Sequence, residues 1–165
     1  MAVDSYRYLP RSFRPMYEGR RFPEQDPVWA AVGPVEEATF GLLTSGGLYL
    51  EGSQQPFDLD RERGEPTWGD PTLRVIPDGV AQEAISAAHL HYNTDLVRQD
   101  FNVALPLRAF HTLQNAGLIG AVAAEHFSVM GFQEHGAAVW AEKTGPEIVA
   151  KCRDAEIDVL VLAPS

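Results

Sequence analysis

Histidine is the residue type in this sequence best suited to proton transfer near neutral pH, and three of the five histidines lie in polar clusters. His89 and His91 form a His-Leu-His pair, so on a strand both imidazoles would lie on one face. The pair ends an apolar run at 84–91, and His126 follows a later apolar run at 118–124. If the two runs are neighbouring parallel strands, their C-terminal ends meet at one edge of the sheet. We therefore expect His89, His91 and His126 to converge and to be catalytic.

The same three histidines are the candidate ligands of a divalent metal, because imidazole also binds first-row metals. His-x-His pairs are common among structural histidines as well. The sequence requires no metal or other cofactor. Catalysis or substrate orientation, metal binding and a structural role thus all stay open for this triad.

Charged side chains follow the same strand ends. Asp70, Asp95 and Asp100 would lie near the histidines if the runs pair as expected. Arg74 follows Asp70 in the segment GDPTLR. Its guanidinium group could hold a substrate carboxylate through paired hydrogen bonds, or it could pair with the local acids.

The remaining reactive residue types point to structural roles. Cys152 is the single cysteine, so no internal disulfide and no thiolate zinc site can form within one chain. It lies on the apolar face of an expected helix, where cysteine behaves as a small hydrophobe. His111 and His135 are expected to face solvent or to cap a helix. Ser45 lacks the G-x-S-x-G pattern of a nucleophilic serine.

Apolar runs and turn residues predict the elements that position these groups. Residues 38–44 form an expected strand, 51–71 a loop, 72–76 a short strand, and 107–116 a helix that ends at Gly117. A second helix is expected after Thr144, with Thr144 as its N-cap and Pro146 at its start. Residues 157–162, IDVLVL, are typical of an interior parallel strand covered on both faces. The pattern predicts an α/β fold with a layered, open, mainly parallel sheet, like half of a Rossmann-like or flavodoxin-like fold.

Composition limits the domain organisation and the partners. The chain has 165 residues, the size of one domain. Residues 1–36 hold five prolines and five arginines and are expected to form an extended arm. Residues 37–165 then form a single α/β domain. A net charge of −10 disfavours nucleic acid and anionic membranes, and no apolar run is long enough to span a bilayer. With no signal peptide, we expect a cytoplasmic protein.

The last strand is followed only by Ala163-Pro164-Ser165, whereas an interior parallel strand normally leads into a crossover helix. Three explanations stay open: another chain covers this face, the strand is tolerated at an edge, or the sequence is truncated. Because an exposed apolar strand promotes association, we expect an oligomer.

Six sequence blocks, in the same order and spacing, resemble the B component (selenoprotein B) of glycine, sarcosine, betaine and D-proline reductases. The blocks are LTSGGLY at 43–49, GSQQPFD at 52–58, GDPTLRVIP at 69–77, HLHYNT at 89–94, DFNVALPLR at 100–108 and GLIGAVAAEHFSVMG at 117–131. Together they cover about residues 38–165. The resemblance implies reductive cleavage of a C–N bond in an amine or amino acid, with a selenocysteine or cysteine nucleophile.

In that family the nucleophile follows the strand equivalent to 157–162, where this sequence ends, so the chain resembles a short form without the Cys/Sec motif. The family also tends to have Tyr-Asp at Tyr92-Asn93 and His-Tyr-Ser at His126-Phe127-Ser128. The substrate-binding residues that the resemblance implies are Ser45, Gly46, Gly47, Asp70, Arg74, Tyr92, Asn93, Ser128 and Met130.

The leading hypothesis is a small subunit of a heteromeric reductase-like enzyme that acts on an amino-acid or amine-type small molecule. A homologous, cysteine-bearing partner chain would supply the nucleophile. Two alternatives stay open: a histidine-based, metal-dependent lyase or hydrolase, and a non-catalytic scaffold subunit.

Overall fold

The computed structural model describes residues 11, 30–65, 68–131 and 137–164. The chain divides into two compact units, residues 1–31 and 32–165. The first unit lies almost wholly outside the described residues, so the Pro-rich arm and its boundary at residue 36 stay predictions. The expectation for His135 also lies outside them. The account below concerns the second unit.

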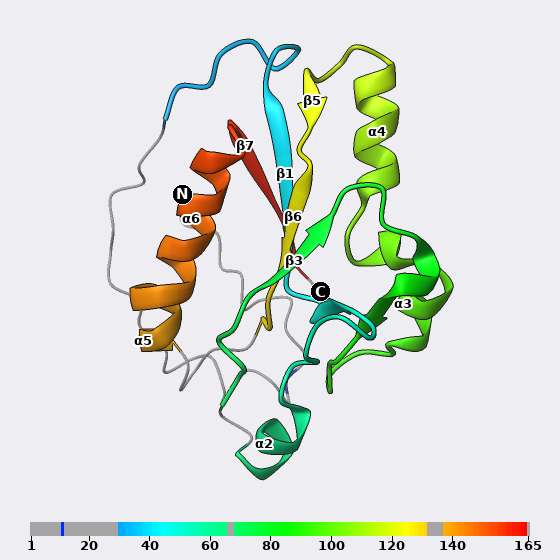
Figure 1. Cartoon of the computed structure of the whole chain (residues 1–165), viewed down its shortest axis with the longest axis vertical. Coiled ribbons are helices and arrows are strands. Elements are labelled where there is room, and N and C mark those ends of the chain that lie inside the picture. The colour runs from blue at the N-terminus through cyan, green and yellow to red at the C-terminus, as the bar shows by residue number, and fades with distance from the viewer. Residues whose placement is uncertain (1–10, 12–29, 66–67, 132–136, 165) are drawn as a thin grey trace. The chain divides into compact units, whose positions relative to one another are not determined.

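The central strand of the sheet is β1 (Thr39–Thr44), whose run of apolar residues suits a strand covered on both faces. It pairs in parallel with β5 (Ala121–Val122) and β6 (Glu125–Ser128) along one edge. Its other edge pairs in parallel with β7 (Val159–Ala163). The strand β3 (Arg74–Pro77) pairs antiparallel with β6 (Figure 1). The expected mainly parallel α/β sheet is confirmed.

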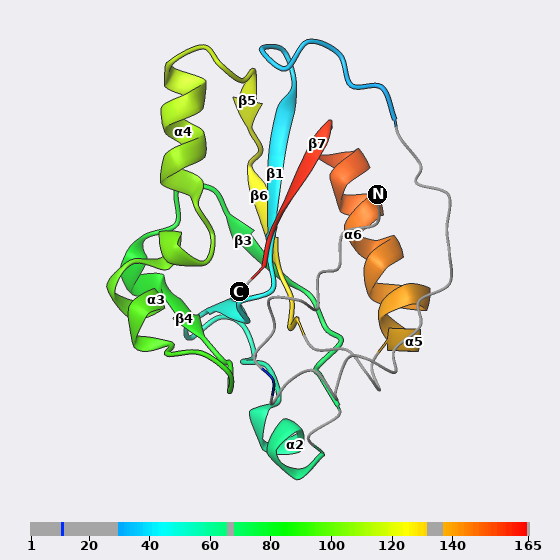
Figure 2. The ribbon, with the colours of Figure 1, turned by 180° about the vertical axis from the view of Figure 1, so that it is seen from behind.

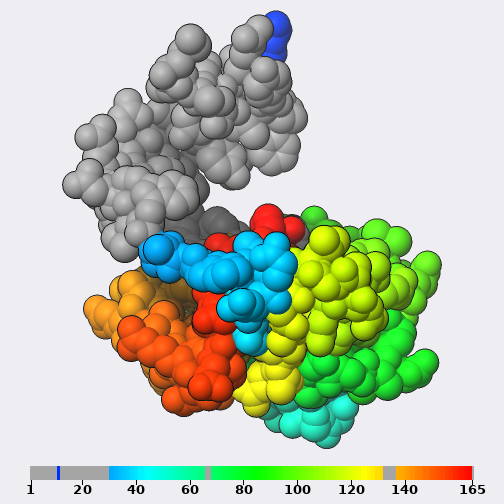
Figure 3. Space-filling model, turned by 90° about the horizontal axis from the view of Figure 1, so that it is seen from above, coloured from blue at the N-terminus to red at the C-terminus, as the bar shows by residue number. Residues whose placement is uncertain are grey.

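Two helices cover the opposite faces of this sheet. Helix α4 (Leu107–Asn115) lies on one face and α6 (Gly145–Asp154) on the other, as both ribbon views show (Figures 1 and 2). Figure 3 shows the same order from above, with the cyan start of β1 between the orange α6 and the yellow-green α4. The expected stop of α4 is confirmed at Gly117, whose φ of 67° is favoured by glycine.

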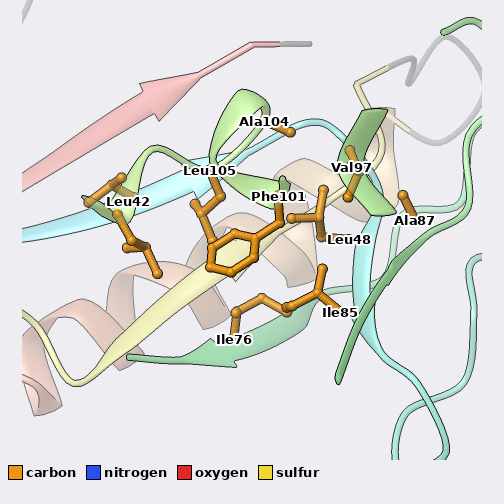
Figure 4. Packing of buried hydrophobic residues seen from close by; sticks show 10 residues of the cluster. Leu42, Leu48, Ile76, Ile85, Ala87, Val97, Phe101, Ala104 and Leu105 are labelled. Atoms are coloured by element: carbon orange, nitrogen blue, oxygen red, sulfur yellow. The ribbon is translucent and has the colours of Figure 1, made fainter. Parts of the chain in front are cut away.

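Alternate side chains of β1 reach the two helical layers, as the period of a strand requires. Phe40 packs against Phe110 of α4, with ring centroids 5.9 Å apart. Leu43 belongs to the apolar cluster that contains Ile148 of α6. The largest cluster lies on the α3/α4 side and is shown in Figure 4. It includes Leu42 and Phe101.

The smaller elements surround the end of the sheet where the parallel strands finish. A two-stranded antiparallel sheet is formed by β2 (Leu48–Leu50) and β4 (Ile85–Ala87). The other helices are α2 (Leu59–Gly64), α3 (Asp95–Gln99) and α5 (Ala137–Val139). Short 3₁₀ turns occupy Gln82–Ala84 and Phe101–Val103, and a π turn occupies Trp140–Thr144. No helix of the described residues is long and apolar enough to cross a membrane.

Three expectations about the elements need correction. The loop expected at 51–71 contains α2, which Asp58 caps by accepting the N–H of Arg61. The run at 84–91 is not a parallel neighbour of β6, because β4 pairs antiparallel with β2. Within the described residues β7 pairs only with β1, and Leu162 is 67% exposed. β7 is thus an edge strand of the sheet that the described residues form, and its side chains are half-buried or exposed.

Helix α6 begins after Thr144, as expected, but the threonine does not cap it. Its hydroxyl group donates instead to the carbonyl oxygen of Pro71. The preceding turns at 137–144 are already helical, so the first N–H groups of α6 find acceptors without a capping side chain.

Candidate functional site

A pocket of about 470 Å³ lies where β1, β6 and β7 end. The carboxyl edge of a parallel sheet is the usual place for ligands in α/β proteins, and the size suits a small molecule. We call it the apolar pocket. Its described lining consists of Leu43, Ser45, Val129, Met130, Gly131, Ala137, Trp140, Ala141, Leu162, Ala163 and Pro164. Ser45 and Met130, expected from the sequence at the substrate, are thus among its walls.

Ser45 lines this pocket and begins the turn Ser45–Gly46–Gly47, whose backbone geometry requires glycine at Gly47. Gly47 has a φ of 63°, and a Cβ atom there would lie 2.3 Å from the carbonyl oxygen of Ala88. No other residue type fits without moving the backbone. Gly46 forms a bridge with Met130, and the N–H of Ser45 donates to the carbonyl oxygen of Ala163 at 3.3 Å. The turn therefore ties all three strand ends together.

Ser128 stabilises the backbone directly after this turn. Its hydroxyl oxygen accepts the N–H of Leu48 at 2.7 Å, and the side chain is fully buried. Thr44 acts in the same way, since its Oγ1 accepts the N–H of Gly46 at 3.0 Å. Ser128 therefore positions the pocket wall and does not reach into the pocket.

A second group of polar residues, hereafter the histidine cluster, consists of Glu62, His89, His91 and Tyr92. The rings of His89 and His91 meet edge to face at 5.5 Å, and the His89 and Tyr92 rings lie 4.5 Å apart. The backbone N–H of His91 donates to Nδ1 of His89 at 3.0 Å, so the neutral His89 ring carries its proton on Nε2. Burial, and then the neighbouring His91, lower the pKa of His89 to about 4. His89 is therefore a neutral hydrogen-bond donor at pH 7.

Tyr92 connects the histidine cluster to the pocket. Its hydroxyl group donates to the carbonyl oxygen of Gly46 at 2.6 Å, in the turn that follows β1. Burial raises the pKa of Tyr92 to about 12, so the phenol stays protonated and acts as a donor. Asn93 is exposed, and its side-chain oxygen accepts the N–H of Asp95 at the start of α3. That contact serves the helix and not the site.

Glu62 is the member of the histidine cluster that the sequence did not reveal. The residue is only 2% exposed, and its Oε1 lies 3.2 Å from Nε2 of His91. Its Oε2 is buried and has no hydrogen-bond partner within the part of the chain that the structure describes. The carboxylate accepts Nε2–H of His91, which leaves Nδ1 of that ring for proton exchange. Glu62 lies on α2, inside the segment expected to be a loop, so no periodic signal marked it.

His126 does not join the other two histidines. It is fully buried, and its Nδ1 accepts the backbone N–H of Leu42 at 3.2 Å. The pairing of β1 shifts at this point: Phe40 aligns with Val122, whereas Leu43 aligns with Phe127. The offset changes by two residues, so Leu42 loses its regular backbone acceptor and the imidazole replaces it. His126 is therefore a structural residue of the strand.

The other nitrogen of His126 faces a separate acid. Nε2 of His126 lies 3.7 Å from Oδ1 of Asp78, and Nε2 of His111 lies 2.8 Å from the same oxygen. Burial lowers the pKa of His126, and the charge of Asp78 only partly offsets this effect. His111 is partly exposed, as expected, and its ring is also bonded to the carboxylate of Asp78.

Arg74 donates four of its five N–H groups to its own loop. Burial lowers the pKa of Arg74, Asp70 partly opposes this shift, and the guanidinium lies 4.3 Å from the centre of the Phe57 ring. Its hydrogen bonds go to Gln55 O (2.7 Å), Thr72 Oγ1 (2.8 Å), Leu73 O (2.9 Å) and Pro56 O (3.3 Å). These contacts fix the segment at residues 55–57. Arg74 is not among the described residues that line the apolar pocket, and its role as a carboxylate clamp stays a prediction.

Asp70 also organises this loop. Asp70 is only 6% exposed. Its Oδ2 accepts the N–H of Asp58 at 2.9 Å, and its Oδ1 accepts the N–H of Thr72 at 2.9 Å. These contacts connect the start of α2 to the start of β3. A buried carboxylate that accepts backbone N–H groups stabilises a loop, as Asx turns do.

The described residues do not assemble the expected metal site. Among residues 30–65, 68–131 and 137–164, no group of three or more His, Cys, Asp or Glu side chains could hold a metal ion. The expected ligand set fails because His126 points to Leu42 and Asp78. Cys152 packs beside Ile148 in the apolar cluster under α6, and burial raises the pKa of its thiol. A thiol of that kind is not activated as a nucleophile.

The fold and the site define an α/β protein with a ligand pocket at the carboxyl edge of a parallel sheet. The chain belongs to the glycine/sarcosine/betaine reductase selenoprotein B family, whose family model matches residues 11–165. The match confirms the resemblance seen in the sequence and indicates a reductase-type subunit. Searches of curated proteins and of solved structures found no match.

Proposed function

We propose that this chain is the small, substrate-binding subunit of a heteromeric reductase that acts on an amino-acid or amine-type substrate. A homologous partner chain supplies the thiol or selenol nucleophile. Membership of the family supports the reductase class. The observation that carries the proposal is the apolar pocket at the strand ends, which the Tyr92–Gly46 hydrogen bond connects to the histidine cluster.

The burial of the single cysteine of this chain supports the proposal that the nucleophile comes from a partner chain. Cys152 lies in the apolar cluster under α6, and burial raises its thiol pKa. In the proposed step, a thiolate or selenolate of the partner forms a bond to the substrate carbon while the C–N bond breaks. The departing amine takes the electron pair of that bond and one proton.

The histidine cluster is suited to provide this proton. His91 exchanges protons through Nδ1 while Glu62 holds Nε2, and proton transfer by a positioned side chain contributes roughly 10²–10⁴-fold to a rate. His89 stays neutral at pH 7 because its pKa is about 4, so it orients the substrate by donating from Nε2. His126 has no part in this step.

Native mass spectrometry of the protein isolated gently from its host is the first test. We expect a complex with a second, cysteine-bearing chain and no bound metal. A homo-oligomer with one metal per chain would overturn the proposal and favour a metal-dependent lyase or hydrolase.

A variant series separates a catalytic subunit from a scaffold. We expect His91→Ala to lower the reductase rate of the purified complex by roughly 100-fold, the lower range for a general acid. His111→Ala is the matched control, because His111 is also partly exposed and bonded to one carboxylate, Asp78. A complex that keeps full activity after both His89 and His91 become alanine would show a non-catalytic scaffold.

A further inference from the structure

A groove of about 520 Å³ lies beside the histidine cluster, between helix α2 and the small sheet of β2 and β4. We call it the α2 groove; its described wall includes Tyr49, Phe57, Asp58, Leu59, Asp60 and Ala88. Two of these residues connect the groove to the cluster. Ala88 directly precedes His89, and Leu59 is followed one helical turn later by Glu62, on the same face of α2. The groove therefore gives a ligand space next to Glu62 and His91.

Glu62 is the residue of this region that points to a ligand. It is buried, although its neighbours on α2, Arg61 and Arg63, are exposed. Its Oε1 is paired with His91, whereas its Oε2 is buried and has no hydrogen-bond partner among the described residues. A buried carboxylate oxygen without a partner is unfavourable, because nothing replaces the hydration that it has lost. A ligand that donates a hydrogen bond to Oε2 would remove this cost.

The proposed reaction indicates the chemistry of this ligand. A proton donor must lie within hydrogen-bond reach of the group that it serves, so the departing nitrogen lies near His91. An aliphatic amine is protonated at pH 7, as lysine is, and its hydrogen bonds to a carboxylate are roughly twice as strong as those of neutral groups. From these observations we infer that Glu62 binds the cationic nitrogen of the substrate and selects an organic ammonium ion over a neutral group of the same shape. The inference rests on the proposed function, since it assigns a residue to the substrate of that reaction.

The charges around the α2 groove place the cation at its α2 end. Asp58, whose Oδ1 caps α2, adds a second carboxylate at this end, and Tyr49 provides aromatic surface for the alkyl part of an amine. The guanidinium of Arg74 lies 4.3 Å from the centre of the Phe57 ring and makes the wall at residues 55–57 more positive. An ammonium group is therefore attracted toward Glu62 and away from that wall.

A side chain must move before a ligand can reach Glu62, because Oε2 is shielded from solvent. The His91 side chain is 61% exposed, whereas that of Glu62 is 2% exposed. Exposed side chains change rotamer within nanoseconds. The backbone N–H of His91 donates to Nδ1 of His89, and rotation of the His91 ring leaves this bond intact. The ring can thus admit the ligand and return to Oε1, while Oε2 accepts from the ammonium group.

The test measures binding to the full-length chain without turnover. The probes are butylammonium and 1-butanol, which share an alkyl chain and differ in charge. The readout is the set of imidazole signals in NMR titrations at about 0.15 M salt, which screens the general attraction of cations to a chain with a net charge of −10. We expect butylammonium to bind at least tenfold more tightly than butanol and to shift the His91 signals. His126 is the internal reference, because its ring is fully buried and bonded to Leu42.

Glu62→Gln keeps the size of the side chain and removes its charge, so the preference for butylammonium over butanol should fall below about twofold. Glu65→Gln is the matched control, because it makes the same change at the end of α2, where the carboxylate is 52% exposed and paired with Arg61. The control should keep the full preference. Urea unfolding verifies that both variants fold, and the comparison of the two probes on the unaltered chain needs no variant.

The outcomes distinguish this inference from the proposed function. Equal binding of the two probes, no binding of butylammonium, a shift of His126 in place of His91, or an unchanged preference in Glu62→Gln would overturn the role of Glu62. None of these results would change the partner chain found in the native complex. Absence of a cysteine-bearing partner there would overturn the reductase subunit and leave the measured cation preference standing.

Discussion

The hydroxyl group of Tyr92 donates a 2.6 Å hydrogen bond to the carbonyl oxygen of Gly46. This contact joins two segments that are 46 residues apart and belong to different parts of the candidate site. Gly46 lies in the turn beside the apolar pocket, and Tyr92 belongs to the histidine cluster. A substitution in the histidine cluster is therefore expected to affect the turn beside the apolar pocket through this hydrogen bond, and a substitution in the turn is expected to affect the cluster.

Tyr92→Phe removes this hydrogen bond and keeps the ring against His89. Because the Gly46 oxygen then loses a buried donor, we expect the free energy of unfolding to fall by about 1–3 kcal/mol. Urea unfolding measures this effect. Tyr49→Phe is the matched control, since the described part of the chain gives no hydrogen bond to the Tyr49 hydroxyl. Equal losses from both substitutions would contradict the assigned role of Tyr92.

Gly47→Ala tests the turn at the end of β1. The backbone there has a φ of 63°, and the new Cβ would lie 2.3 Å from the Ala88 oxygen. We expect a loss of about 3 kcal/mol, since left-handed strain and overpacking add. Gly52→Ala separates the two causes, because its φ is 78° and nothing lies within 4 Å of the added atom. That variant should lose about 1 kcal/mol in urea unfolding; equal losses would contradict the close contact.

His126 predicts a loss of stability in mild acid. Burial lowers the pKa of His126 in the folded chain, whereas the unfolded ring titrates near the ordinary value of about 6.5. The unfolded state therefore binds more protons below pH 6.5, and stability is present above that pH and lost as the pH falls toward the lowered value. Asp78 and His111 face the same ring. We expect a slope of up to about 1.4 kcal/mol per pH unit from this group.

Unfolding at pH 7.5 and 5.5 measures this slope, and His126→Asn is the diagnostic variant. Asparagine keeps an acceptor for the Leu42 N–H but does not titrate, so its stability should change less between the two pH values. His89 adds to the acid sensitivity of both proteins, because its pKa is about 4. An unchanged slope in His126→Asn would contradict the assignment.

Glu62→Gln tests the pairing with His91. The amide keeps the size of the side chain and removes the buried charge, so the fold should lose less than about 1 kcal/mol. The reductase rate of the complex should fall roughly tenfold, which is the value of one charge-assisted hydrogen bond of about 1.5 kcal/mol. Asp78→Asn, which changes the partner of His111 instead, should leave the rate intact. A rate loss in Asp78→Asn alone would place the proton donor elsewhere.

Local patterns in the sequence predicted the elements that show a regular apolar period or a clear start or stop signal. The apolar run of β1, the spacing of α4 with its stop at Gly117, and the start of α6 after Thr144 all follow from short-range chemistry. The family blocks were also visible, because glycine turns such as Gly46–Gly47 tolerate few substitutions.

The tertiary structure alone decided how these elements pair and where the polar side chains point. An apolar run does not report whether the edge of a strand is paired, so β7 was expected in the interior and lies at an edge of the sheet that the described residues form. His126 followed an apolar run like His89, yet the two-residue shift beside β1 turned its ring toward Leu42. Glu62 met His91 only because α2 folds back over residues 29 positions away in sequence. Such contacts depend on long-range packing, which no local pattern encodes.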